Sequence, residues 1–219
     1  MAASRTKVLI ESGKTKVFAV ALDWPGWARA GKKTSEAALE ELEAYAPRYA
    51  EVAKRAGVPL PGELTYAVVE QVAGSTSTDF GIPHELVKAD LRRWTGAEAE
   101  RQVAIMKAAW DYLNEVGAAA PPKLAKGPRG GGRDRDPVLQ HVVSAEAGYG
   151  RMFGVKHKEP ALGDQDAIAA MRAEFVEVLS QPSSGGRIGG EKKWPARYAV
   201  RRIVWHVLDH AWEIQDKTG

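Results

Sequence analysis

The sequence predicts an α+β protein in which a small N-terminal α+β domain is followed by an all-α four-helix bundle with a crossover connection. Short strand-like segments separated by turn residues occur in the first 72 residues. Four longer stretches after residue 95 instead repeat apolar residues every three or four positions, as in the seam of a helix bundle. We therefore expect domains at residues 1–72 and 95–219, joined by a connector at residues 73–94.

The composition is typical of a globular protein, with 219 residues of which 44% are hydrophobic and 27% charged. No run of about eighteen apolar residues is present, so we expect no membrane span. The N-terminus lacks the apolar segment of a signal peptide and the chain has no cysteine, so we expect a cytoplasmic protein. The net charge of +3 is mild for a nucleic-acid-binding protein, which usually has a denser basic face.

The N-terminal domain is expected to be a small β-β-(β)-α-β unit. Residues 7–11 and 16–22 are interpreted as a hairpin. Thr34 is a good N-cap for a helix to about Ala56, and residues 63–72 are expected to form a further strand.

The four long helices have recognisable ends. Residues 95–98 form a Thr-x-x-Glu capping box that begins the first helix. Asp136 followed by Pro137 predicts an N-cap and first helical position for the second. The third and fourth helices are expected over residues 165–179 and 194–217.

Three histidines form the candidate metal site. His206 and His210 lie four residues apart on the seam of the last helix, so both side chains share one inward face. His141 lies on or beside the apolar stripe of the second helix. Three neutral imidazole ligands would leave a coordination position open, as in a catalytic metal site.

Depth along the helices decides whether these histidines can meet. His141 lies about 6 Å into its helix and His210 about 10 Å from the end of the last one, at 1.5 Å per residue. The depths match only if the two helices are antiparallel. A simple up-down-up-down bundle makes them parallel, so the metal hypothesis requires a crossover connection.

Carboxylates and arginines near the histidines are further candidates. Glu146, Asp209 and Glu213 are candidates for orienting the imidazoles or for acid–base work, although each could equally be a solvated or ion-paired carboxylate. The Gly-rich loop before the second helix could bind an anion or could be a solvated connection. The arginines of the last helix could bind a substrate carboxylate or could cross-link the bundle. The anion-binding candidates are Arg129, Arg133, Arg135, Arg197 and Arg201.

The stretch from Val17 to Gly26, with Asp-Trp-Pro-Gly at its end, followed by Gly31-Lys-Lys-Thr-Ser-Glu-Ala-Ala-Leu39, resembles HicB-like proteins over about residues 5–72. That resemblance implies a partial ribonuclease-H-like fold that contacts a protein partner and is commonly joined to a DNA-binding segment. No such segment follows here. The alternative is a small α+β domain that packs against the rest of the chain.

Residues 95–219 resemble the DinB-like metalloprotein superfamily. The resemblance rests on Trp194-Pro-Ala-Arg197 and on Arg201-Arg-Ile-Val-Trp-His206-Val-Leu-Asp-His210, with one histidine early in an earlier helix. It implies a four-helix bundle of unusual connectivity and a divalent-metal site, with zinc or nickel held by His141, His206 and His210. Some members are similar to thiol S-transferases or isomerases that use a low-molecular-weight thiol.

Three functions therefore stay open. The first is a metal-dependent transferase, isomerase or hydrolase acting on a small molecule; because the chain has no cysteine, any thiol must be a small-molecule substrate. The second is a non-catalytic binding module that uses the HicB-like domain for a protein partner. The third is nucleic-acid binding through the Arg/Gly-rich loops, which would be strongly salt-dependent.

Overall fold

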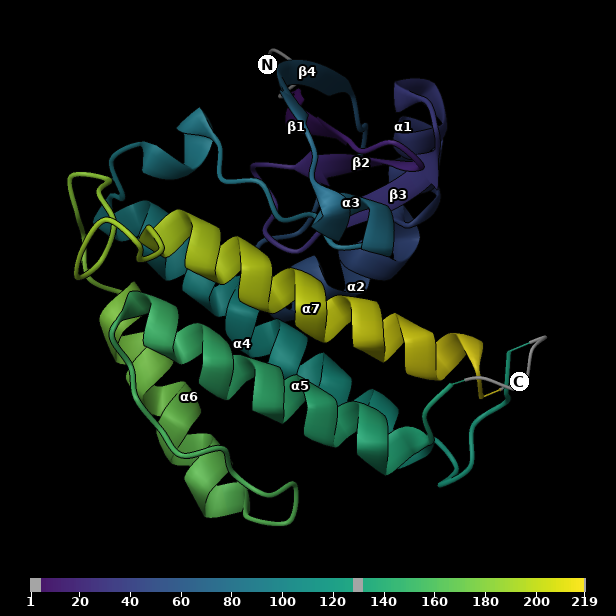
Figure 1. Cartoon of the computed structure of the whole chain (residues 1–219), viewed down its shortest axis with the longest axis vertical. Coiled ribbons are helices and arrows are strands. Elements are labelled where there is room, and N and C mark those ends of the chain that lie inside the picture. The colour runs from purple at the N-terminus through teal and green to yellow at the C-terminus, as the bar shows by residue number, and fades with distance from the viewer. Residues whose placement is uncertain (1–4, 128–131, 219) are drawn as a thin grey trace.

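The chain folds into a four-stranded sheet and a group of long helices packed beside it (Figure 1). The computed structural model describes residues 5–127 and 132–218. The predicted α+β class, with the sheet in the N-terminal part and long helices after it, is confirmed. Among the described helices, none combines the length and apolar character that crossing a membrane requires. The strands are β1 (Thr6–Ser12), β2 (Lys16–Ala21), β3 (Ala28–Lys32) and β4 (Tyr66–Ala73).

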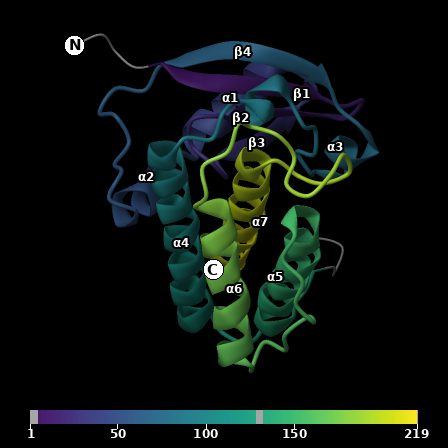
Figure 2. The same cartoon turned by 90° about the vertical axis from the view of Figure 1, so that its left-hand side faces the viewer.

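The sheet has the order β3-β2-β1-β4. The β1–β2 and β2–β3 pairs are antiparallel, as expected for strands joined by tight turns, and β4 pairs parallel to β1. A parallel partner needs a long crossover, which the helices between β3 and β4 provide. Figure 2 shows the sheet on one side of the long helices.

The single helix expected from Thr34 to Ala56 is two helices, α1 (Ser35–Ala44) and α2 (Ala46–Arg55). The predicted N-cap is confirmed, since the Thr34 hydroxyl accepts a hydrogen bond from the Ala37 amide at 3.1 Å. The break is explained by Pro47, whose ring would clash with the carbonyl one turn earlier in a continuous helix but fits the first turn of a new one.

The connector is held to the sheet by a buried carboxylate. It contains α3 (Thr76–Phe80) and the 3-10 turn η1 (Lys88–Leu91). Glu11 of β1 is fully buried and accepts hydrogen bonds from the backbone amides of His84 and Glu85 at 3.0 and 3.1 Å. His84 itself is exposed.

The expected long helices are present, and α5 and α7 run in opposite directions (Figure 1). After α5 the chain returns along that helix before α6 begins: the Pro160 carbonyl accepts from Gln140, and the Leu162 amide donates to Gln140. The helices are α4 (Gly96–Ala119), α5 (Arg135–Gly150), the 3-10 turn η2 (Arg151–Phe153), α6 (Gln165–Leu179) and α7 (Ala196–Asp216).

The predicted start of α5 at an Asp136 N-cap is wrong, because the helix begins two residues earlier with Asp134 as N-cap. Pro137 then occupies the third helical position. The amides of the first turn have no partner inside a helix, so proline is tolerated there as well. The Asp134 carboxylate pairs with Lys123 and Lys126 instead of capping the helix.

The sheet and the long helices share their apolar contacts. Trp205 of α7 packs in one cluster with Leu9, Phe18 and Val20 of the sheet. A second, larger cluster joins the opposite face of the sheet to α1, α2 and the four long helices. The division into two domains at residues 1–72 and 95–219 stays a prediction.

Candidate metal centre

His141, His206 and His210 come together between α5 and α7. One potential ligand atom from each histidine lies within 4.8 Å of the others. His141 lies near the start of α5 and His210 near the end of α7. Because the two helices are antiparallel, these two histidines lie at the same level along the helix pair, as the metal hypothesis required. The three rings meet at steep angles, with centroids 4.6 to 5.1 Å apart.

The nitrogen spacing fits a tetrahedral cation. The Nε2 atoms of His141 and His206 lie 3.3 Å apart. Two nitrogens bound at about 2.0–2.1 Å in tetrahedral geometry would lie about 3.4 Å from each other. His210 bonds through Nδ1 to a carboxylate, which leaves its Nε2 as the ligand atom. The three histidines therefore offer one ligand atom each within 4.8 Å of the others, a donor set that suits a divalent cation.

Burial keeps two of these imidazoles neutral. His206 is buried, and desolvation holds its pKa well below the usual value, with the charges of His210 and Arg202 adding to the shift. Burial also lowers the pKa of His141, followed by the charges of His210 and Arg133. Because a histidine must lose its proton to bind a metal, these shifts prepare the site for a cation near neutral pH.

Glu213 is the predicted carboxylate that does contact the histidines. Its Oε2 accepts a hydrogen bond from Nδ1 of His210 at 2.7 Å, and its Oε1 accepts from Nζ of Lys217. The bond to His210 and the pairing with Lys217 lower the pKa of Glu213 to about 2. A carboxylate behind a ligand imidazole fixes the tautomer and the ring orientation, so Glu213 is a positioning residue for His210.

Glu146 and Asp209 are engaged away from the three histidines. Glu146 is fully buried and accepts from Nε1 of Trp110 and from Nε and Nη2 of Arg172, at 3.1 and 2.9 Å. Asp209 accepts from Nη1 of Arg29 in β3 at 3.0 Å. Both carboxylates therefore link elements of the fold. This is the ion-paired role that the sequence analysis gave as the alternative for each.

The two candidate arginines of the last helix, Arg197 and Arg201, cross-link the fold. Arg201 donates to Asp90 at 2.6 and 3.2 Å, and Arg197 donates to Glu98 at 3.0 Å. Arg135 donates to Asp136 at 2.7 Å and to the carbonyl of Ala120.

Of the two arginines in the loop before α5, Arg133 is exposed and its charge acts on both His141 and His206. Arg129 lies outside the described residues. The loop therefore contributes one described arginine to the surroundings of the site.

Sequence reasoning missed Arg202 and the role of Tyr149. Arg202 is buried one helical turn before His206, and the Tyr149 ring centroid lies 5.6 Å from that of His206. The signal was available, because residues 202, 206 and 210 repeat every four positions along one helical face.

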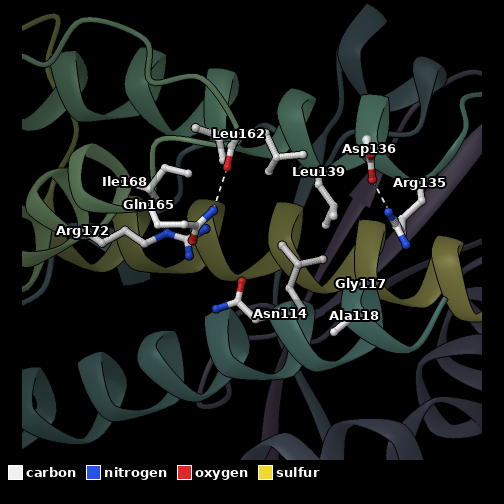
Figure 3. A pocket seen from close by; sticks show the side chains of 12 residues that line it. Asn114, Gly117, Ala118, Arg135, Asp136, Leu139, Leu162, Gln165, Ile168 and Arg172 are labelled. Atoms are coloured by element: carbon white, nitrogen blue, oxygen red, sulfur yellow. Dashed lines mark hydrogen bonds and ion pairs between the residues drawn. The ribbon is translucent and has the colours of Figure 1, made fainter. Parts of the chain in front are cut away.

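A cavity of about 440 Å³ lies away from the histidines, between α4, α5 and α6 (Figure 3). Figure 3 shows Arg172 and Arg135 on opposite sides of it, and both side chains already pair with carboxylates. Leu113, Leu139 and Ile168 make much of its wall apolar. Its lining residues include neither a free charged group nor a metal-ligand cluster, so within the described part of the chain the three histidines remain the candidate site.

His157, which lies in the connection between η2 and α6, pairs with Glu174 of α6 at 2.7 Å and takes no part in the cluster. Comparisons of the chain with protein-family models, with curated proteins and with solved structures find no match. The geometry of the three histidines is therefore the basis for assigning a function.

Proposed function

We propose that this chain is a divalent-metal-binding protein of the DinB-like kind that holds zinc or nickel through His141, His206 and His210. The observation that supports this is the convergence of three imidazoles, with two Nε2 atoms 3.3 Å apart. Three nitrogen ligands leave a position for a further ligand, which is typical of catalytic rather than structural sites.

The chain connectivity favours the same proposal. Antiparallel α5 and α7 and the return segment along α5 are compatible with a DinB-like four-helix bundle of unusual connectivity (Figure 1). We also propose that residues 5–72 form a HicB-like domain. This part of the proposal rests only on the sequence resemblance.

The reaction that we propose is thiol transfer or isomerisation with a low-molecular-weight thiol, or hydrolysis of a small molecule. A divalent cation at the site would lower the pKa of a water or thiol that it binds. Around it, Glu213 orients His210, and exposed Arg133 adds positive charge that favours an anionic substrate.

Elemental analysis of the purified protein tests the metal site. We expect about one zinc or nickel per chain in the wild type and a loss of metal in His141→Ala and in His206→Ala. His84→Ala is the matched control, because it removes an exposed histidine outside the cluster and should keep the metal. A wild type that stays metal-free after incubation with zinc and nickel would rule out the metalloprotein proposal.

The alternative is a non-catalytic module that binds a protein partner through the N-terminal sheet. β4 is an edge strand, and Val69 on it is 51% exposed. An open strand edge can pair with a strand from another protein. This alternative predicts partner binding that survives His206→Ala and is lost in Val69→Lys.

A further inference from the structure

Arg202 is a buried arginine whose hydrogen-bonding edge lacks a partner. Its side chain is on α7, and the residue is only 7% exposed. Its Nε and Nη1 atoms are buried and make no hydrogen bond with any described residue. Buried guanidinium groups are normally paired, because an unsatisfied charged donor is costly to bury.

Aromatic rings cover the guanidinium without satisfying its N–H groups. The central carbon of the group lies 4.6 Å from the Trp205 ring centroid and 5.4 Å from that of Tyr149. Stacking on aromatic rings stabilises a cation through its faces, and the buried Nε and Nη1 atoms at its edge still lack an acceptor.

The neighbouring arginines of α7 show how the fold treats a structural arginine. Arg201, the adjacent residue, forms two hydrogen bonds with the Asp90 carboxylate, and Arg197 bonds to Glu98. Arg202 has no carboxylate partner among the described residues. An incoming carboxylate would give Arg202 the hydrogen-bond acceptor that Asp90 gives to Arg201 and Glu98 gives to Arg197.

Arg202 also lies close to the three histidines. It precedes His206 by one helical turn, a rise of about 6 Å. The Tyr149 ring contacts both residues, since its centroid is 5.6 Å from that of the His206 ring. The guanidinium and the histidine cluster are therefore close enough to hold the two ends of one small molecule.

We propose that Arg202 binds the carboxylate group of a small substrate whose other end lies at His141, His206 and His210. The planar guanidinium fork matches a carboxylate through two parallel hydrogen bonds, and its single charge balances one negative charge. This inference rests on the proposed metal-binding function for the position of the reacting end, and it names the substrate class as a carboxylic acid.

The test uses cobalt-loaded protein and ω-mercapto carboxylates with two to four carbons, each compared with its neutral amide. Calorimetry gives the dissociation constants, and the thiolate-to-cobalt absorption band reports whether the thiol binds the metal. We expect the wild type to bind at least one acid about tenfold or more tightly than its amide, and Arg202→Gln to lose that preference. Arg92→Gln, which removes the same charge from an exposed residue that lines a separate pocket, should keep it.

A wild type that binds every acid and amide equally would overturn the inference, as would a folded Arg202→Gln protein that keeps the preference. If Arg202→Gln does not fold, Arg202→Lys decides: it keeps the charge without the fork, so the preference should fall severalfold, and an unchanged preference overturns the inference. The two proposals fail differently. Equal binding of acids and amides with a cobalt band refutes only the carboxylate site, whereas acid-specific binding without a cobalt band refutes only the metal site.

Discussion

Replacing Glu213 with alanine is the sharpest test of how the histidine cluster is positioned. The 2.7 Å bond from His210 Nδ1 to Glu213 Oε2 fixes one of three ligand rings. Losing such a partner typically weakens metal binding by about 10- to 100-fold, or about 1.4–2.7 kcal/mol. The Glu213 side chain is 29% exposed, so water can partly replace it, and we expect a loss near tenfold.

Competition with a coloured chelator measures this affinity directly. Glu213→Gln keeps an acceptor but loses the charge, so its affinity should fall less than that of Glu213→Ala. Lys217→Met is the control: it removes the other partner of Glu213 without touching His210, and its affinity should stay within about twofold of wild type. A Glu213→Ala protein that binds zinc as tightly as wild type would refute the positioning role.

Three further outcomes follow from the buried and paired charges. Arg201→Met leaves Asp90 buried without its partner, so the free energy of unfolding in urea should fall by about 3–5 kcal/mol, and a loss below about 1 kcal/mol would contradict the pairing. Glu146→Gln should also lower stability, but the folded variant should keep the full metal content. A loss of metal from this variant would show that Glu146 is part of the site. Pairing lowers the pKa of Glu213 from 4.5 to about 2, so ionised Glu213 favours the folded state. The stability difference between wild type and Glu213→Gln should be complete above about pH 4.5 and disappear as the pH falls towards 2; a difference unchanged at pH 2 would contradict the shift.

The histidine cluster was predictable because, for antiparallel helices, helix geometry sets which histidines lie at the same depth. His206 and His210 share a face by their spacing, and the rise per residue put His141 at the matching depth of an antiparallel neighbour. Strands and long helices were predictable for a related reason, since apolar spacing records which face is buried. Pro47 was visible in the sequence, and its effect on the helix was overlooked.

The partners of the charged residues could not be predicted in the same way. Arg201 pairs with Asp90, which is 111 positions earlier in an irregular connector without periodicity. Glu146 and Arg172 meet because the chain returns along α5 before α6 begins, and no local pattern specifies that path. The spacing of Arg202 placed it on the face of the histidines, but it was missed because an arginine on a helix is expected to reach solvent. The aromatic rings beside its guanidinium are seen in the packed structure.

The position of α7 against the sheet has a consequence for the order of folding. Arg29 of β3 and Asp209 of α7 are 180 residues apart in sequence, and Trp205 needs the sheet to be buried. Contacts between such distant segments carry the loop-closure cost of the whole intervening chain and slow the folding of a domain. Because His206 and His210 reach His141 only when α7 docks, we expect the histidine cluster to form late, after the hairpin of β1 and β2.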